Sequence, residues 1–277
     1  MAPAITHFLV GASLLLVLVT PIAVRYETDR DHAIWLIPIG GLWGLVLDVH
    51  HVAPVFEREL YAIHNSPWAD LFAFHYTLDR QAVRTFSLER IFVSIVLFIG
   101  AVAIFWGTRR LRPGAYQIRT GLDRVIGAGV TTVIAASYAT VAMGVAVSVQ
   151  EGFRSVSTIV GNDSTLVGGI VVGAIGIGLG LLCGLGLEGI PGDKRRTRPS
   201  VTALGGGAFG VMVWLGGVGI GVPLRDRFLS EGNLSIPFIH WGGLVALVVY
   251  GATFGVAYGI VRGVFQLGEP RQPLKEL

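Results

Sequence analysis

Histidine and aspartate side chains crowd into one stretch of this sequence, residues 48–88. Asp48 and His51 stand three positions apart and His75 and Asp79 stand four apart, so each pair shares one face if the stretch is helical. Neutral imidazole nitrogens and carboxylate oxygens are the ligands that Zn²⁺ and other divalent ions prefer. The two pairs therefore predict a site for a divalent metal ion, such as Zn²⁺.

The full set of candidate metal ligands combines these pairs with the histidines nearest to them: His7, Asp48, His50, His51, His75 and Asp79. We expect at least three of them to converge on one ion, although His7 and Asp79 are 72 positions apart. His64 is a further ligand or a general base. Arg58 or Arg84 would hold a phosphate or carboxylate group of a substrate. An ion with an open position binds water and lowers its pKa, so hydrolysis is the reaction that this set favours.

Each of these residues also has a simpler explanation when it is taken alone. A histidine at a membrane interface often hydrogen-bonds lipid headgroups or backbone, and Asp79 beside Arg80 could be an ordinary surface charge. The set carries more weight, because ionisable groups near the lipid boundary of membrane proteins tend to be functional.

The composition of the chain identifies the elements that must position this set. Of the 277 residues, 52% are hydrophobic and 14% are charged, and the mean hydropathy is +0.66. These values exclude an ordinary soluble domain. Runs long enough to cross a membrane, about 20 residues each, lie at 8–24, 33–49, 88–107, 123–148, 164–188, 201–222 and 236–262.

The predicted fold is therefore an all-α, polytopic transmembrane helix bundle of about seven spans. The second span is short and contains Pro38, so it could be tilted, kinked or re-entrant, and a count of six stays open. Residues 48–88 are too polar to span and too aromatic for a solvated linker. They predict short interfacial helices between spans 2 and 3.

Arginine-rich loops predict the orientation, because Lys and Arg accumulate on the cytoplasmic side. The loops at 108–122 and 189–200 and the tail after the seventh span carry most of them. The N-terminus is then outside and the C-terminus cytoplasmic, in the cell membrane. Six of the seven histidines fall on the outer side, and only His32 falls inside.

The sequence divides near the Arg-Pro-Gly step at residue 113 into two halves of different character. The half 1–112 bears the His/Asp set, and the half 113–277 holds four Gly-rich spans. Gly176, Gly180 and Gly184 recur at every fourth residue, a spacing that favours close helix packing in lipid. A ligand groove lined by backbone is the alternative for these glycines, and the Gly-rich half as a whole could dock a membrane partner or a second copy of the chain.

Two stretches resemble the membrane-bound metal-dependent hydrolase family of bacteria and archaea, which begins with a Thr-His element and continues with Pro-Asp-x-Asp-His. They are Thr6, His7 and Gly11 at the head of the first span, and Asp48-Val49-His50-His51 at the end of the second. The resemblance aligns Asp48 with the first Asp of the motif and His51 with its His. His50 stands in place of the second Asp, and Leu47 replaces the Pro.

The family's later His-Arg-x-x-Thr-His element does not occur in this sequence, and His64 or the stretch 75–79 is proposed as its substitute. The resemblance covers roughly the first 80 of the 277 residues. It implies a reaction class, metal-dependent hydrolysis, whose substrate would be lipid-linked or part of the cell envelope.

A non-enzymatic membrane protein, either an assembly subunit or a transporter, is the alternative. Transport of a charged substrate is disfavoured, since the spans contain almost no charged residues at mid-depth. The pI of 9.2 reflects the basic loops and favours anionic headgroups over nucleic acid. The lysines number only two, Lys194 and Lys275, which favours a GC-rich, archaeal source.

Overall fold

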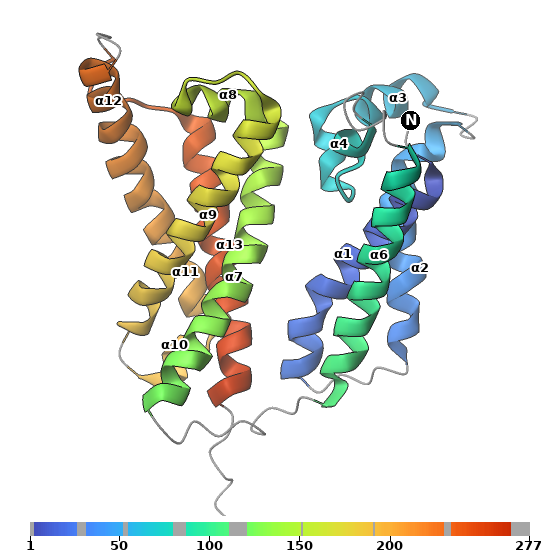
Figure 1. Cartoon of the computed structure of the whole chain (residues 1–277), viewed down its shortest axis with the longest axis horizontal. Coiled ribbons are helices and arrows are strands. Elements are labelled where there is room, and N and C mark those ends of the chain that lie inside the picture. The colour runs from blue at the N-terminus through green and yellow to red at the C-terminus, as the bar shows by residue number, and fades with distance from the viewer. Residues whose placement is uncertain are drawn as a thin grey trace, which may run out of the picture. The chain divides into compact units, whose positions relative to one another are not determined.

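The computed structural model describes residues 3–26, 32–51, 55–79, 87–110, 121–150, 152–190, 192–229 and 234–266. Within these ranges the chain forms helices and no strand. It divides into two compact units, Met1–Arg112 and Pro113–Leu277 (Figure 1). The boundary coincides with the start of the Arg-Pro-Gly step, in a segment outside the described residues.

Unit 1 consists of long apolar helices with a group of short helices at one end. Its described elements are α1 (Ala4–Arg25), η1 (His32–Trp35), α2 (Leu36–Leu45), η2 (Val46–His51), α3 (Glu57–His64), η3 (Pro67–Leu71), α4 (His75–Asp79), α6 (Ser87–Gly107) and η4 (Thr108–Arg110), where η1 to η4 are 3₁₀-helices. Helix α1 packs against both α2 and α6. Figure 1 shows α3 and α4 gathered at the end of this unit where the N-terminus lies.

Glycines bring α1 and α2 into backbone contact. A Cβ atom on Gly11 would collide with the carbonyl oxygen of Gly40, and one on Gly44 would collide with the carbonyl oxygen of His7. Side chains at these positions would force the two helices apart. The close approach holds His7 beside the end of α2, directly before the 3₁₀-helix that carries Asp48.

The segment after η2 folds into the short helices that the sequence predicted between two spans. Helix α3 begins after Phe56 and α4 begins after the turn Ala73–Phe74, and these three residues have positive φ angles of 59°, 55° and 61°. Non-glycine residues adopt this left-handed conformation rarely. The surrounding contacts must therefore enforce the sharp turn that starts α4 at His75.

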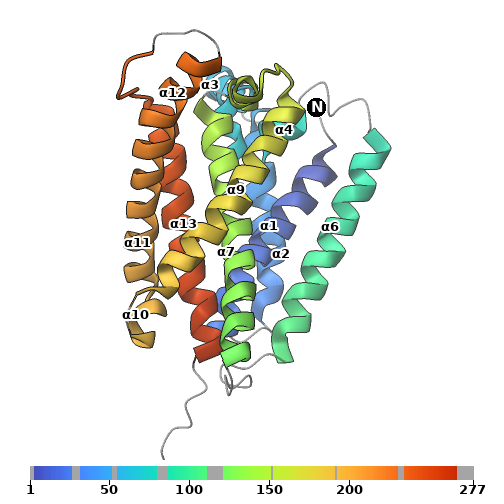
Figure 2. The ribbon, with the colours of Figure 1, turned by 60° about the vertical axis from the view of Figure 1, so that its left-hand side comes forward.

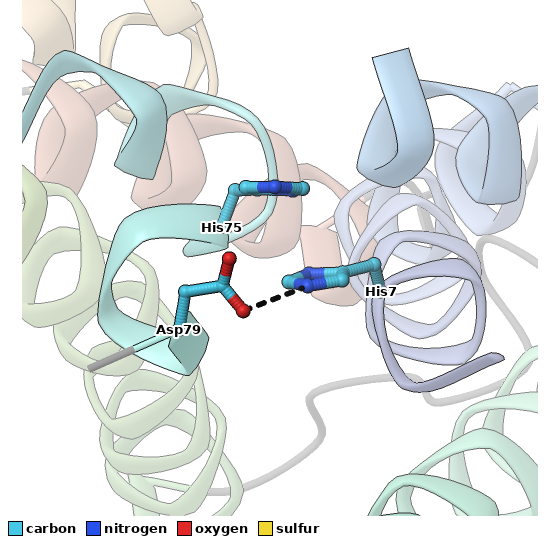
Figure 3. A group of neighbouring side chains, drawn as sticks. All are labelled: His7, His75 and Asp79. Carbon is cyan, nitrogen blue, oxygen red and sulfur yellow. Dashed lines mark ion pairs between the residues drawn. The ribbon is translucent and has the colours of Figure 1, made fainter. Parts of the chain in front are cut away.

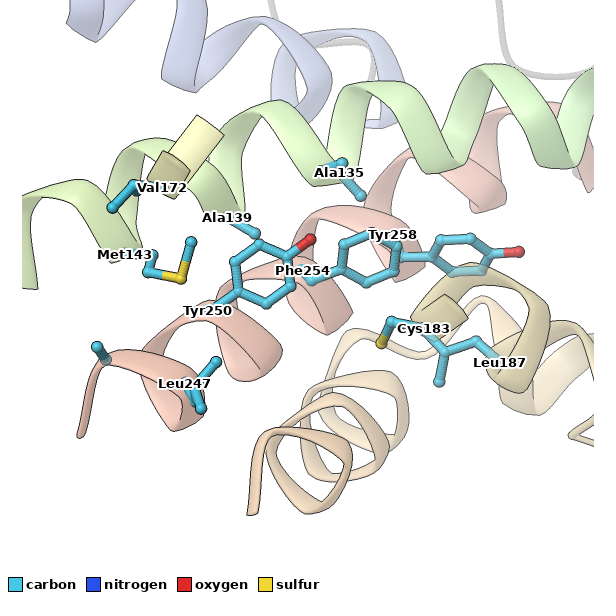
Figure 4. Close-up of a cluster of buried hydrophobic side chains, with 12 residues drawn as sticks. Ala135, Ala139, Met143, Val172, Cys183, Leu187, Leu247, Tyr250, Phe254 and Tyr258 are labelled. Carbon is cyan, nitrogen blue, oxygen red and sulfur yellow. The ribbon is translucent and has the colours of Figure 1, made fainter. Parts of the chain in front are cut away.

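Unit 2 is a bundle of long helices. Its described elements are α7 (Gly121–Gln150), α8 (Phe153–Ser157), η5 (Thr158–Val160), α9 (Thr165–Glu188), α10 (Asp193–Arg196), α11 (Pro199–Val213), the π-helix η6 (Trp214–Gly221), α12 (Val222–Leu229) and α13 (Trp241–Gln266). Helices α11 and α13 run side by side (Figure 2), and α13 also packs against α7. A row of stacked rings, Tyr250, Phe254 and Tyr258, forms the centre of the core (Figure 4).

The glycine stripe on α9 packs inside unit 2. Gly176, Gly180 and Gly184 all face side chains of α7, and a Cβ atom on Gly180 would lie 2.5 Å from the Cβ atom of Ala136. These glycines therefore serve the close helix packing that their spacing predicted.

A network of charged side chains around the buried Arg262 stabilises one end of unit 2. The Glu188 carboxylate lies 2.9 Å from Nε of Arg262 and 3.0 Å from Nη1 of Arg196, and it also accepts a hydrogen bond from the Tyr258 hydroxyl. Arg262 is completely buried. Because buried charges are tolerated only when they are paired, this network ties the end of α9 to α10 and α13.

Six helices in the described part of the chain are long and apolar enough to cross a membrane: Ala4–Arg25, Leu88–Gly107, Asp123–Gln150, Thr165–Glu188, Pro199–Phe228 and Trp241–Phe265. The second predicted span, 33–49, forms three successive short helices, of which α2 has only 10 residues. Pro and Gly reduce helix propensity in this segment, and both of its ends adopt the tighter 3₁₀ geometry. The chain is a helical, multi-pass membrane protein, and the count of seven spans is not confirmed.

Candidate metal site

Five titratable side chains from four elements of unit 1 converge at the end of α1. They are His7 of α1, Asp48 of η2, His64 of α3, and His75 and Asp79 of α4. Their donor atoms form two groups, one of His7, His75 and Asp79 and the other of Asp48, His64 and His75. Within each group all donor atoms lie within 4.8 Å of one another. Figure 3 shows the first group, with Asp79 pointing toward the ring of His7.

Four distances between imidazole Nε2 atoms and carboxylate oxygens lie between 3.4 and 3.6 Å, and each is slightly too long for a hydrogen bond. They are 3.6 Å for His7 to Asp79 Oδ1, 3.6 Å for His64 to Asp48 Oδ1, 3.5 Å for His64 to Asp79 Oδ2 and 3.4 Å for His75 to Asp48 Oδ1. Hydrogen bonds of this type have lengths of about 2.7–3.2 Å. Ligands placed tetrahedrally around Zn²⁺ at about 2.0–2.2 Å are about 3.3–3.6 Å apart. These four distances are therefore compatible with ligands around a common ion.

The imidazole rings of the site are buried, and several of their nitrogens have no hydrogen-bond partner. His7, His64 and His75 are only 1%, 3% and 0% exposed. Both ring nitrogens of His7 and of His64, together with Nε2 of His75, lack a hydrogen bond. A buried polar atom without a partner costs about 1–3 kcal/mol. A bound cation would satisfy several of these atoms at once.

A backbone hydrogen bond fixes the tautomer of His75. Its Nδ1 lies 3.0 Å from the carbonyl oxygen of Gly44, and a carbonyl can only accept, so Nδ1 carries the proton. In neutral His75 the lone pair is therefore on Nε2, the atom that faces Asp48. Metal-binding histidines commonly donate their second ring N–H in this way.

Asp70, which the sequence reasoning missed, supports the helix that bears two of the donors. It is only 2% exposed. Its Oδ1 accepts a hydrogen bond of 2.7 Å from the backbone N–H of Thr77, and its Oδ2 accepts one of 2.7 Å from the Thr77 hydroxyl. At the other end of α4, Arg90 donates to the carbonyl oxygen of Leu78. An acidic residue seven positions before a threonine gives no recognisable pattern, so this support had no signal in the sequence.

Three of the predicted site residues lie outside the two donor groups. His50 is buried, its Nδ1 lies 2.8 Å from the carbonyl oxygen of Leu47, and its ring is 4.5 Å from that of His64. His51 is exposed and packs its ring on His50, while Arg58 is exposed on α3. His64, predicted as a ligand or a general base, lies among the donors. Arg84 and Arg80 are outside the described residues.

The electrostatics of the donors follow from burial and from their mutual proximity. Burial opposes ionisation of Asp48, but the neighbouring His75, His7 and His64 lower its pKa below the ordinary value. Burial also works against the charged form of His75, yet the Asp48 carboxylate and the Gly44 carbonyl raise its pKa. The pKa of His64 is lowered, first by burial and then by the other histidines. The lowered pKa favours the neutral form of His64, and the raised pKa favours the protonated form of His75.

Comparison with family models, with curated proteins and with solved structures finds no match to this chain. The functional argument therefore depends on the site itself.

Proposed function

We propose that this chain is a membrane-embedded, metal-dependent hydrolase whose site lies at the outer face of the membrane. One observation carries the proposal: buried imidazole nitrogens without hydrogen-bond partners lie 3.4–3.6 Å from carboxylate oxygens, the separation of ligands around one cation. The resemblance to the membrane-bound metal-dependent hydrolases agrees with it at His7 and Asp48, whereas His51, which the resemblance aligns with the His of the motif, is exposed and lies outside both donor groups. Zn²⁺ is the first candidate, because the donors are imidazoles and carboxylates.

Each residue of the proposed site has a role that its position supports. His64 and His75 present neutral Nε2 atoms to the ion, and Asp48 and Asp79 supply negative charge. The carbonyl oxygen of Gly44 orients the ring of His75. A divalent ion lowers the pKa of a bound water toward neutrality, and the resulting hydroxide is the nucleophile that hydrolysis needs. Arg58 remains a candidate for binding an anionic group of the substrate, since it is exposed on α3, the helix that ends at His64.

A lipid-linked or envelope substrate suits the surface beside the site. The short helices α3 and η3 and the residue before them expose large apolar or aromatic side chains, with Phe56 at 72%, Tyr61 at 58% and Trp68 at 60%. Aromatic side chains of this kind are favoured at the level of lipid headgroups. We therefore place α3 and η3 in the membrane interface, where an amphiphilic substrate would reach the metal.

The orientation belongs to the same proposal. With η1, α2 and η2 counted as a seventh crossing, the N-terminus and the donor groups lie outside, and α10 and the C-terminus lie in the cytoplasm. Three further arginines on and after α10, Arg195, Arg196 and Arg198, agree with that side.

The alternative of a non-enzymatic partner-docking protein has less support. Of the Gly-rich half that suggested it, the stripe Gly176, Gly180 and Gly184 is already used for packing within unit 2. It also gives no physical reason for the buried imidazole nitrogens of unit 1 that lack hydrogen bonds.

The decisive experiment measures metal content and metal-dependent hydrolysis on the same purified full-length chain. We expect at least one divalent ion per chain, and cleavage of chromogenic phosphodiester or ester probes that a chelator abolishes and Zn²⁺ restores. His75→Ala should lose both metal and activity, whereas His51→Ala, which alters an exposed histidine, should retain both. Folded wild-type protein that binds no divalent ion would refute the proposal.

A further inference from the structure

The two carboxylate oxygens of Asp79 face different histidines. Oδ1 lies 3.6 Å from Nε2 of His7, and Oδ2 lies 3.5 Å from Nε2 of His64. A carboxylate that serves a single ion would usually direct one or both oxygens to that ion. Asp79 instead presents one oxygen to each side of the site.

The remaining donors divide in the same way. Oδ1 of Asp48 lies 3.6 Å from Nε2 of His64, and within the described residues Asp48 forms no ion pair with His7. His75 belongs to both donor groups, but its Nε2 lies 3.4 Å from Asp48 Oδ1, which places it with His64 and Asp48. One side of Asp79 thus holds His64, His75 and Asp48, and the other holds His7.

Both sides have buried imidazole nitrogens that lack a hydrogen bond, which indicates a ligand. Nε2 of His7 and Nε2 of His64 are each without a hydrogen bond and more than nine-tenths buried. A single ion held by His64, His75 and Asp48 would leave Nε2 of His7 with only its 3.6 Å approach to Asp79, which is too long for a hydrogen bond. A second cation beside His7 removes this cost.

From this geometry we infer a two-metal centre in which Asp79 bridges the ions. The inference rests on the proposed hydrolase function and deepens it. One ion is held by Asp48, His64, His75 and Asp79 Oδ2, and the other by His7 and Asp79 Oδ1, so the second ion keeps more positions for water or substrate. Ions in two-metal hydrolytic sites lie about 3.5–4 Å apart, which a bridging carboxylate can span.

The charge balance of such a centre indicates the substrate class. Two divalent ions bring four positive charges, and Asp48 and Asp79 neutralise two of them. Asp70 does not contribute, because both of its oxygens accept hydrogen bonds from Thr77. The excess positive charge favours an anionic group, and two-metal sites stabilise the displacement at phosphorus in phosphate esters. A phosphate ester on a lipid-linked substrate is therefore the class that this centre fits.

Metal stoichiometry of the full-length protein tests the inference. Purified protein loaded with Mn²⁺ or Zn²⁺ should contain two ions per chain, and the Mn²⁺ form should give the electron paramagnetic resonance spectrum of a coupled pair. His7→Gln should retain one ion and lose the coupling, and Asp48→Asn should weaken the other ion. Glu57→Ala, which removes an exposed carboxylate of α3 outside both donor groups, is the matched control and should keep two coupled ions. The wild-type spectrum needs no variant, so it gives an answer even if His7→Gln fails to fold.

The outcomes separate this inference from the proposed function. One ion per wild-type chain with metal-dependent hydrolysis overturns the two-metal centre and leaves the hydrolase intact. Loss of all metal in folded His7→Gln and also in folded Asp48→Asn likewise indicates one shared ion and overturns the inference. Absence of bound metal from the wild-type protein overturns both.

Discussion

Removal of the Asp70 carboxylate should weaken metal binding although Asp70 lies in neither donor group. Asp70→Ala deletes two hydrogen bonds of 2.7 Å to Thr77 of α4. Hydrogen bonds to a charged group contribute about 1.5–3 kcal/mol each, so the lower bound of that range gives a loss of about 3 kcal/mol. If half or all of this loss falls on the position of α4, it corresponds to about a ten- to a hundredfold change in metal affinity, at about 1.4 kcal/mol per factor of ten.

We therefore expect the metal Kd of Asp70→Ala to rise about 10- to 100-fold, the range seen when residues that orient metal ligands are removed. Thr77→Val keeps the backbone N–H bond and loses only the hydroxyl bond, so its Kd should rise by about the square root of that factor. Competition with a chromophoric chelator measures both. Glu57→Ala is the matched control, because Glu57 is an exposed carboxylate on α3 of the same unit.

A structural role for Asp70 independent of the metal would give a different pattern. The midpoint temperature of thermal unfolding would then fall by the same amount with a chelator as with metal, and the metal Kd would not change. A Kd of Asp70→Ala within twofold of wild type, in protein that stays folded, would show that α4 does not need Asp70 to present its donors.

Three further predictions concern packing, pH and orientation. Gly180→Leu should reduce the yield of folded protein or destabilise it by about 1–3 kcal/mol, whereas Gly178→Leu on the open face of the same helix should be tolerated. Thermal unfolding in detergent measures both variants, and equal stability would contradict the packing of α9 on α7. Metal affinity should fall by about tenfold per pH unit as pH drops below the raised pKa of His75, because one proton then competes with the ion. Metal titrations at several pH values measure this slope, and a flat profile would contradict His75 as a ligand. A cysteine at position 115 in a chain lacking the native cysteine should resist impermeant thiol reagents in intact cells, and labelling from outside would reverse the orientation.

The sequence was sufficient for the class of the protein because hydropathy is a local property. A run of about 20 apolar residues commits its own backbone to a helix in lipid wherever the rest of the chain lies. Six such runs appear as long helices. The second run shows the limit of this reasoning, since its apolar character could not distinguish one continuous helix from α2 flanked by two 3₁₀-helices.

The sequence also supplied all five donors as candidates, because imidazole and carboxylate groups near a lipid boundary are costly unless they find partners. His7, Asp48, His64, His75 and Asp79 were all candidates by residue type. Their partners could not be read in the same way, because spacing of three or four residues defines neighbours only within one helix.

Tertiary structure decided which of these residues meet. Asp48 faces His75, which is 27 positions away, and the nearby His51 is exposed instead. The meeting depends on backbone contact between α1 and α2 at Gly44 and on the turn that starts α4. These are long-range contacts whose free energy comes from packing rather than from any local pattern, and for that reason the sequence named the donors while only the fold paired them.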